Sequence, residues 1–239
     1  MKELFFELAG YASGLVRGGE VLLANFDAEV SDFLRFNRAR VRQPMTVRQA
    51  YLTLELVDGR RHDRTTLAVT GNADEDRPAL RAAIEAMRAD LPSLPDDPYL
   101  LYCTDAGVSD NVRSGRMPSP EEAVETITAD GAGLDLVGIL ASGPVYRGFA
   151  SSLGARHWHE VSSFLLDWSV YSSGDKAVKA SYSGEQWDRA EVARRIDATR
   201  AQLPYLARNP RTIEPGAYRA YVSPAAMDEL LWMLNWGGV

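Results

Sequence analysis

The run VRQAYLTLELV, from Val47 to Val57, is followed by Asp58-Gly59 and then by a second run from His62 to Thr70. Small and branched apolar side chains occupy every second position of the first run, which is the period of a β-strand with one buried face. Asp-Gly is a frequent two-residue turn because glycine tolerates the positive φ that a tight hairpin requires. This stretch predicts an antiparallel hairpin.

Strand and helix signals continue on both sides of this hairpin. Further strands are expected at Val21–Phe26, Val30–Phe36, Val41–Gln43, Leu134–Ser151 with a break at Gly143-Pro144, His157–Tyr171, Lys176–Ser183 and Tyr218–Ser223. Helices are expected over residues 2–16, from Asn72 to Ala89, from Ser119 to Asp130, from Trp187 to Gln202, and from Pro224 onward. Because strands come in hairpins rather than alternating one for one with helices, the pattern predicts the α+β class with mostly antiparallel strands.

Prolines mark the expected domain boundaries. Pro92, Pro95 and Pro98 lie close together, and such a cluster cannot continue a helix or a central strand. We expect two β-rich domains with flanking helices. The expected divisions are a first α+β domain at residues 1–92, a connector at 93–118, a second α+β domain at 119–214, and the start of a truncated third domain at 215–239.

Composition limits the possible functions. The 239 residues include 26 basic and 33 acidic side chains, for a net charge of −7, with one cysteine and three histidines. A single cysteine excludes an intrachain disulfide and a CxxC pair, and the acidic balance argues against general nucleic-acid affinity. No apolar run is long enough to span a membrane, and acids at Glu3 and Glu7 argue against a secretory signal, so a cytoplasmic location is expected.

Two groups of side chains are candidate sites. His157 and His159 share one face of an expected strand and could reach one metal ion, although a third ligand would have to come from elsewhere; otherwise they are solvent-facing strand residues. Arg38, Arg40 and Arg42 alternate, which predicts a cationic strand face. That face could bind an acidic peptide or nucleic acid, or it could be a solvated edge whose charges discourage strand pairing.

Other chemistry finds no support in the sequence. Cys103 has no base near it in a recognisable motif and is expected to be a buried structural residue. The chain lacks a P-loop, a GxGxxG following a strand and a GxSxG elbow. No catalytic residue can be named from motifs alone.

Several segments, taken in order, resemble the TldD/PmbA family, once called modulators of DNA gyrase. They are Ser31–Gln43, Leu52–Val57 with Asp58-Gly59-Arg60-Arg61 and Thr65-Thr66, Phe164–Tyr171, Lys176–Gly184, Pro215–Tyr218, and Tyr221–Pro224 with Ala226–Leu231. The resemblance implies the first two domains of that family and a cytoplasmic peptidase system. Active members hold zinc with an HExxxH helix motif and a later cysteine, cut unfolded peptides, and pair with a homologous subunit that lacks the motif.

The sequence departs from that family at the zinc motif. Trp232, Met233 and Gly237 stand where the histidine, glutamate and second histidine are expected, and none of the three can serve as zinc ligand or general base. We therefore expect a PmbA-like, non-catalytic chain with no cofactor of its own, acting as a dimer partner and peptide-binding scaffold. The alternatives are a metallopeptidase in its own right, through His157 and His159, or a binding module for acidic peptides or nucleic acid.

Overall fold

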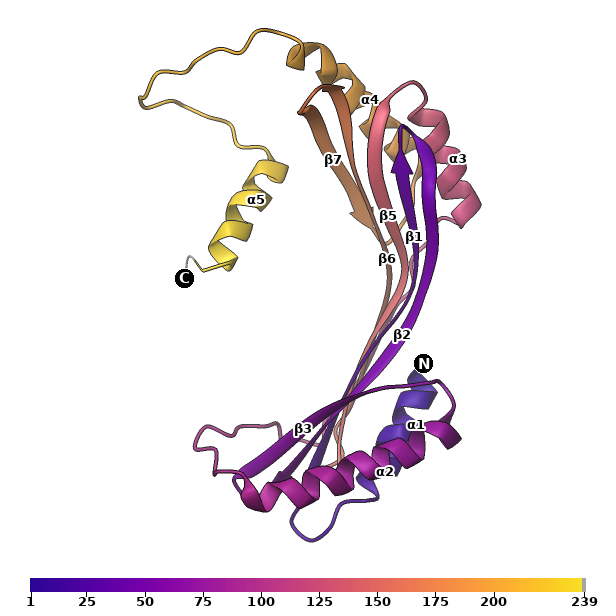
Figure 1. The fold of residues 1–239 in the computed structure, drawn as a ribbon, viewed down its shortest axis with the longest axis vertical. Coiled ribbons are helices and arrows are strands. Elements are labelled where there is room, and N and C mark those ends of the chain that lie inside the picture. Colours follow the sequence, from indigo (N-terminus) through magenta and orange to yellow (C-terminus); the bar gives the residue numbers. More distant parts are fainter. Residues whose placement is uncertain (238–239) are drawn as a thin grey trace. The chain divides into compact units, whose positions relative to one another are not determined.

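The computed structural model describes residues 1–237 of the chain, which divide into two units, Met1–Ala207 and Arg208–Val239. The first unit contains one sheet of seven strands (Figure 1). The strands are β1 (Val21–Asn37), β2 (Arg40–Asp58), β3 (Arg61–Ala68), β4 (Val108–Arg113), β5 (Asp135–Ser151), β6 (Arg156–Ser173) and β7 (Lys176–Gly184). The strand order is β3-β2-β1-β5-β6-β4, with β7 also paired to β6, and only the β4–β6 pair is parallel.

Four α-helices and a short 3₁₀ turn belong to the same unit. They are α1 (Lys2–Ser13), α2 (Ala73–Asp90), η1 (Leu91–Ser93), α3 (Pro120–Asp130) and α4 (Arg189–Leu206). Ser119 caps α3, its hydroxyl accepting a bond of 3.1 Å from the Glu122 amide, and Asn72 caps α2 in the same way. The predicted α+β class with mostly antiparallel strands is confirmed.

The hairpin predicted at Asp58-Gly59 joins β2 to β3, and Gly59 has the positive φ of 60° that the turn needs. The strand runs expected as Val21–Phe26 and Val30–Phe36 are one continuous strand, β1. The break expected at Gly143-Pro144 is only partial. There β5 remains paired with β6 but loses its pairing with β1, and a Cβ on Gly143 would lie 2.1 Å from the Val30 carbonyl oxygen.

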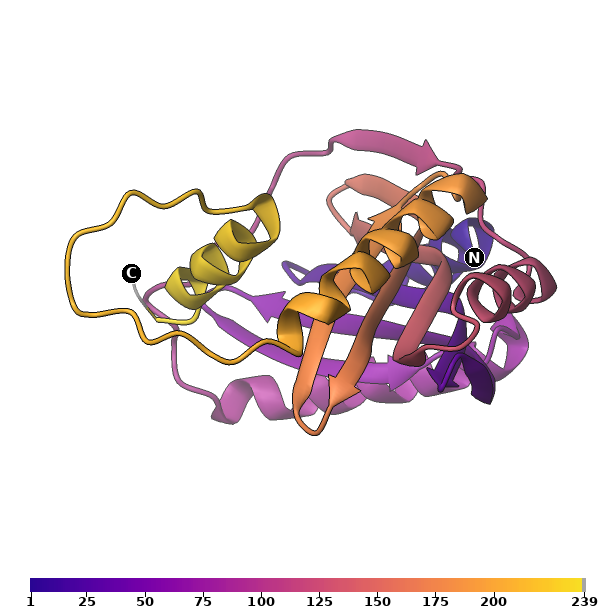
Figure 2. The same ribbon diagram turned by 90° about the horizontal axis from the view of Figure 1, so that it is seen from above.

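Two of the three hydrophobic clusters in residues 1–237 lie on the same face of this sheet, because the even-numbered residues of β1, β5 and β6 face the helices along the whole strand length. One core packs α1 and α2 over residues such as Leu22, Phe26 and Trp158. The other packs α3 and α4 over residues such as Phe36 and Leu166. Figure 2 shows α4 lying across β6 and β7 at that end. A third, small cluster on the opposite face packs Leu100 and Tyr102 of the connector against Val21, Leu23 and Val57.

Residues 1–92 and residues 119–214 are interleaved in the structure, since each core takes residues from both segments, such as Trp158 in the first and Phe36 in the second. β1 pairs with β5 from Leu23 opposite Ser151 to Asn37 opposite Val137, so strands from both segments share one hydrogen-bonded sheet. Such pairing joins residues more than a hundred positions apart. Local sequence patterns carry no information about it.

Two expected elements differ from the structure. The connector contains a strand, β4, which adds in parallel to β6, and residues 218–223 are irregular rather than a strand. In the second unit, helix α5 (Pro224–Asn235) has no buried residue. Within residues 1–237, no helix has both the length and the apolar character needed to cross a membrane.

Candidate functional site

The two histidines predicted as a pair lie side by side on β6, on the sheet face opposite the helices. The parallel register places Ser109 of β4 opposite His157 and Asn111 opposite His159. The Ser109 hydroxyl lies 2.7 Å from Nδ1 of His157, and the Asn111 amide nitrogen lies 3.1 Å from Nδ1 of His159. Each imidazole is therefore oriented by a β4 side chain.

These histidines line a polar hollow of about 750 Å³ on the sheet face that carries no helix. Its charged walls are largely neutralised within the hollow, since Arg147 forms an ion pair of 2.9 Å with Asp27. The other polar residues in its lining are Asn25, Thr53, Glu55, Arg64, Ser109 and Asn111. The hollow offers hydrogen-bonding groups but little uncompensated charge.

The hollow does not fit a metal ion. Among residues 1–237, no three His, Cys, Asp or Glu side chains come together as a metal-binding group. Serine and an amide nitrogen face the two imidazoles, and neither completes the donor set that zinc prefers. The same holds for the family zinc motif, where Trp232, Met233 and Gly237 supply no ligand.

Between the two histidines, Trp158 points to the opposite face and anchors this part of β6. Its side chain is 2% exposed, and its ring lies 6.1 Å from those of both Phe5 and Phe26, measured between centroids. Gly148 permits this packing, because a Cβ there would lie 2.5 Å from the Phe5 ring. The position of the histidine pair thus follows from the packing of a core strand.

The predicted arginine face has a different geometry from the expected one. Arg38 lies in the two-residue turn between β1 and β2 and not in a strand; Arg38 and Ala39 have φ values of 53° and 52°. A register shift next to Arg35 leaves Arg42 without a partner in β1, which also breaks the alternation. The predicted single cationic strand face is therefore replaced by a cationic hairpin end.

We call the hairpin end from Arg35 to Arg48 the arginine arm. Its five arginines, all exposed, are Arg35, Arg38, Arg40, Arg42 and Arg48. None of them forms an ion pair with a carboxylate anywhere in residues 1–237, although most arginines of the first unit do. A hollow of about 1150 Å³ lies between the arm and α3.

Three arginines of the arm line this hollow. Arg38, Arg40 and Arg42 line one side, and α3 contributes Val124 and Thr128. One carboxylate, Asp135, also lines it without pairing to the arginines. The arm thus concentrates uncompensated positive charge in a protein whose net charge is −7.

Other site predictions are answered plainly by the structure. Cys103 is exposed, so the expectation of a buried cysteine is wrong. It lies in the connector between η1 and β4. Ser109 and Asn111 are functional-site neighbours that the sequence did not predict, because they lie in the expected connector at 93–118, where no strand was expected. The sequence signal for β4 is weak, because the polar residues Ser109, Asp110 and Asn111 follow one another between Val108 and Val112 and no alternation with apolar residues results.

No protein-family model and no curated protein sequence matches this chain. Solved structures do. TldE from Thermococcus kodakarensis superposes with a TM-score of 0.59 at 10% identity, over 84% of this chain and 47% of that one. A candidate modulator of DNA gyrase from Bacteroides thetaiotaomicron gives 0.55 at 15% identity, over 84% and 49%. A second candidate modulator of DNA gyrase, from Thermotoga maritima, superposes with a TM-score of 0.52 at 9% identity, over 84% of this chain and 47% of that one.

At these identities the likeness is one of fold. It confirms the fold that the sequence resemblance to the TldD/PmbA family implied, since two of these structures are named as modulators of DNA gyrase, the former name of that family. The chain spans about half the length of each solved structure that it matches.

Proposed function

We propose that this chain is a non-catalytic, PmbA-like member of a TldD/PmbA peptidase system, serving as partner subunit and peptide-binding scaffold. The observation that carries the proposal is the shared fold over 84% of the chain with TldE and with two proteins named for gyrase modulation. The segments that resemble the family add to it, because they occur in the family's order along the same part of the chain.

The chemistry at the motif positions supports a non-catalytic role. Indole, thioether and glycine at 232, 233 and 237 provide neither zinc ligands nor a general base. The histidine pair on β6 provides two imidazoles already oriented by Ser109 and Asn111. Cleavage in such a system would therefore depend on zinc held by the other subunit.

An uncovered sheet face supports the scaffold role. The odd-numbered residues of β5 and β6 face away from the helices, and several apolar ones remain well exposed, among them Ile139, Leu165 and Tyr171. An exposed mixture of apolar and hydrogen-bonding groups suits extended polypeptide chains without strict sequence preference.

The test is reconstitution with a homologous subunit that carries HExxxH. We expect a stable complex by size-exclusion chromatography with light scattering, and zinc-dependent cleavage of an unfolded peptide that this chain enhances but does not perform alone. Zinc-dependent cleavage by this chain alone would refute the non-catalytic role, and failure to form a complex with any such subunit would refute the partner role.

A further inference from the structure

Part of β2 has an unpaired edge. β1 pairs with β2 along nearly its whole length, but β3 pairs only with residues 51–58, so within residues 1–237 the outer side of residues 40–50 meets no strand (Figure 1). Unpaired backbone groups on an exposed edge are a template for a further strand.

The direction of the free backbone groups can be assigned. The Ala50 carbonyl accepts a bond of 2.9 Å from the Val69 amide on the β3 side, so the even-numbered residues of β2 point their N–H and C=O groups outward there. Thr46 and Arg48 accordingly present both groups to the free edge. Pro44 presents only its carbonyl, and a proline fits this position because its missing N–H would have faced solvent.

The same edge carries the arginine arm. Its five arginines have no carboxylate partner within residues 1–237. The nearby acids Asp32 and Glu29 accept hydrogen bonds from Thr46 and Gln49 and keep their charge, but the five arginines outnumber them. Charge complementarity therefore calls for an acidic ligand.

The turn of the arm supplies an independent observation. A two-residue turn with positive φ at both positions favours Asn or Gly, yet Arg38 and Ala39 occupy it. Ala39 is 6% exposed and packs near Gly131, which accounts for an alanine there. The Ala39 amide also donates a bond of 3.0 Å to the Leu136 carbonyl, and these contacts hold the turn. The exposed Arg38 keeps its left-handed backbone without an ion pair within residues 1–237, and a strained, exposed residue of this kind is a candidate functional residue.

We propose that the arginine arm binds an acidic, extended polypeptide segment, which adds as a strand to the free edge of β2 at residues 44–49. Backbone bonds to Thr46 and Arg48 hold the segment as a strand, and its carboxylates pair with the arm's guanidinium groups. The backbone pairing is limited at one end by β3 and at the other by Pro44. Beyond Pro44 the segment continues past Arg42 and Arg40 through side-chain contacts alone.

The edge favours a peptide over nucleic acid. A phosphodiester backbone has no N–H to donate to the outward carbonyls of Thr46 and Arg48. Single-stranded nucleic acid also depends on exposed aromatic rings for stacking, whereas Phe36 is buried and Phe33 half-buried. Nucleic-acid binding is therefore an outcome of the test and not part of the proposal.

This inference rests on the proposed scaffold function and adds to the β5–β6 face a second peptide surface, the β2 edge, with a preference for acidic segments. The two can fail separately. If the chain joins a motif-bearing subunit but does not bind an acidic peptide, only the inference is wrong. If it binds the peptide but joins no such subunit, the arm is a peptide site outside a peptidase system.

The experiment measures fluorescence anisotropy of labelled probes with the full chain. The probes are a peptide of alternating Glu and Val, the same peptide with Lys for Glu, the Glu peptide N-methylated at alternate backbone amides, and a single-stranded oligonucleotide. The variant is R40A/R42A, and R211A/R219A is its charge-matched control in the second unit. Circular dichroism verifies that both fold.

We expect the Glu–Val peptide to bind in preference to the other three probes. The R40A/R42A variant should weaken binding about tenfold, at about 0.7 kcal/mol for each exposed charge contact, while R211A/R219A leaves it unchanged. Equal binding of the N-methylated peptide would overturn strand addition. Tighter binding of the oligonucleotide, or equal loss in both variants, would overturn the acidic-peptide site.

Discussion

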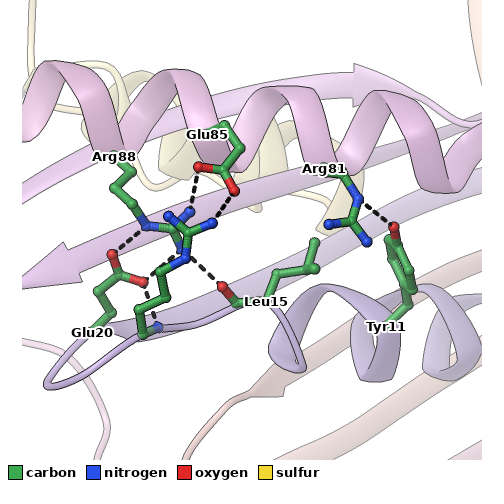
Figure 3. Close-up of polar contacts among 7 residues, drawn as sticks. Tyr11, Leu15, Glu20, Arg81, Glu85 and Arg88 are labelled. Carbon is green, nitrogen blue, oxygen red and sulfur yellow. Dashed lines mark hydrogen bonds and ion pairs between the residues drawn. The ribbon is translucent and has the colours of Figure 1, made fainter.

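Arginines at the two ends of the sheet have opposite surroundings. Around α2, the Arg88 guanidinium lies 2.5 Å from one Glu20 oxygen and 2.9 Å from Glu85, and Arg81 donates to the Tyr11 hydroxyl at 3.1 Å (Figure 3). Glu20 and Arg88 are 9% and 16% exposed. In the arginine arm, all five guanidinium groups are exposed and none has a carboxylate partner within residues 1–237.

The difference separates arginines that hold the fold from arginines that are free to hold a ligand. Arg88 joins α2 to the loop before β1, because it bonds Glu20 and the Leu15 carbonyl together. Removing such a group should cost stability and leave binding unaffected. Removing an arm arginine should weaken ligand binding and leave stability nearly unchanged.

Arg88→Ala is the substitution expected to change the free energy of unfolding most. It leaves the nearly buried Glu20 carboxylate without its partner, and we expect a loss of about 3 kcal/mol of unfolding free energy, measured by urea denaturation. Arg40→Ala is the matched control and should stay within about 0.5 kcal/mol of the parent. Equal losses in the two variants would remove the distinction between the two ends.

The same pair makes stability depend on pH. Hydrogen bonding to Arg88 holds the pKa of Glu20 below its usual value of 4.5. A lowered carboxyl pKa contributes stability that is present above the unfolded value and is lost as the pH falls below about 4.5 through the folded pKa. The effect should be smaller than that of Arg88→Ala, because a protonated Glu20 still accepts hydrogen bonds.

Denaturation midpoints measured between neutral pH and pH 3 check this. Since other carboxylates also titrate there, the comparison is with Arg88→Ala, whose decline on acidification should be shallower than that of the parent. If the midpoints of the parent and of Arg88→Ala fall equally on acidification, the Glu20–Arg88 pair makes no pH-dependent contribution to stability.

Arg38→Gly should stabilise the protein. Glycine adopts the φ of 53° without strain, so we expect a gain of about 1 kcal/mol in thermal or chemical unfolding. The same variant should bind the acidic peptide more weakly. A variant that is both less stable and an equal binder would show that Arg38 serves the turn and not a ligand.

The smallest effect is expected at the histidine pair. His157→Ala removes the contact with Ser109, and we expect a loss of about 0.5–1 kcal/mol with no change in peptide binding. Metal analysis of purified parent and His159→Ala proteins is the companion measurement. A stoichiometric metal in the parent that disappears in His159→Ala would make the pair a metal site and contradict its structural role.

Local features of this fold could be predicted, whereas distant pairings could not. The Asp58-Gly59 hairpin and the helix starts at Asn72 and Ser119 depend on neighbouring residues and were predicted correctly. The joining of β1 to β5 and the addition of β4 to β6 depend on contacts between distant segments, which no local period encodes.

The candidate sites also combine features that neighbouring residues predict with features that depend on distant pairings. That His157 and His159 share a face follows from the period of a strand, but their partners on β4 do not. The arginine cluster was visible in the sequence. Its strained turn, its lack of ion pairs and the free edge beside it became apparent only once the pairing of β2 was known.

Residue-resolved hydrogen exchange on β2 tests the central claim most directly. The amides of Thr46 and Arg48 face the free edge and should exchange rapidly in the free protein, whereas those of Val47 and Gln49 bond to β1 and should be protected. Saturating acidic peptide should slow Thr46 and Arg48 selectively. Unchanged exchange at both amides, with the peptide shown to be bound, would contradict strand addition at the arginine arm.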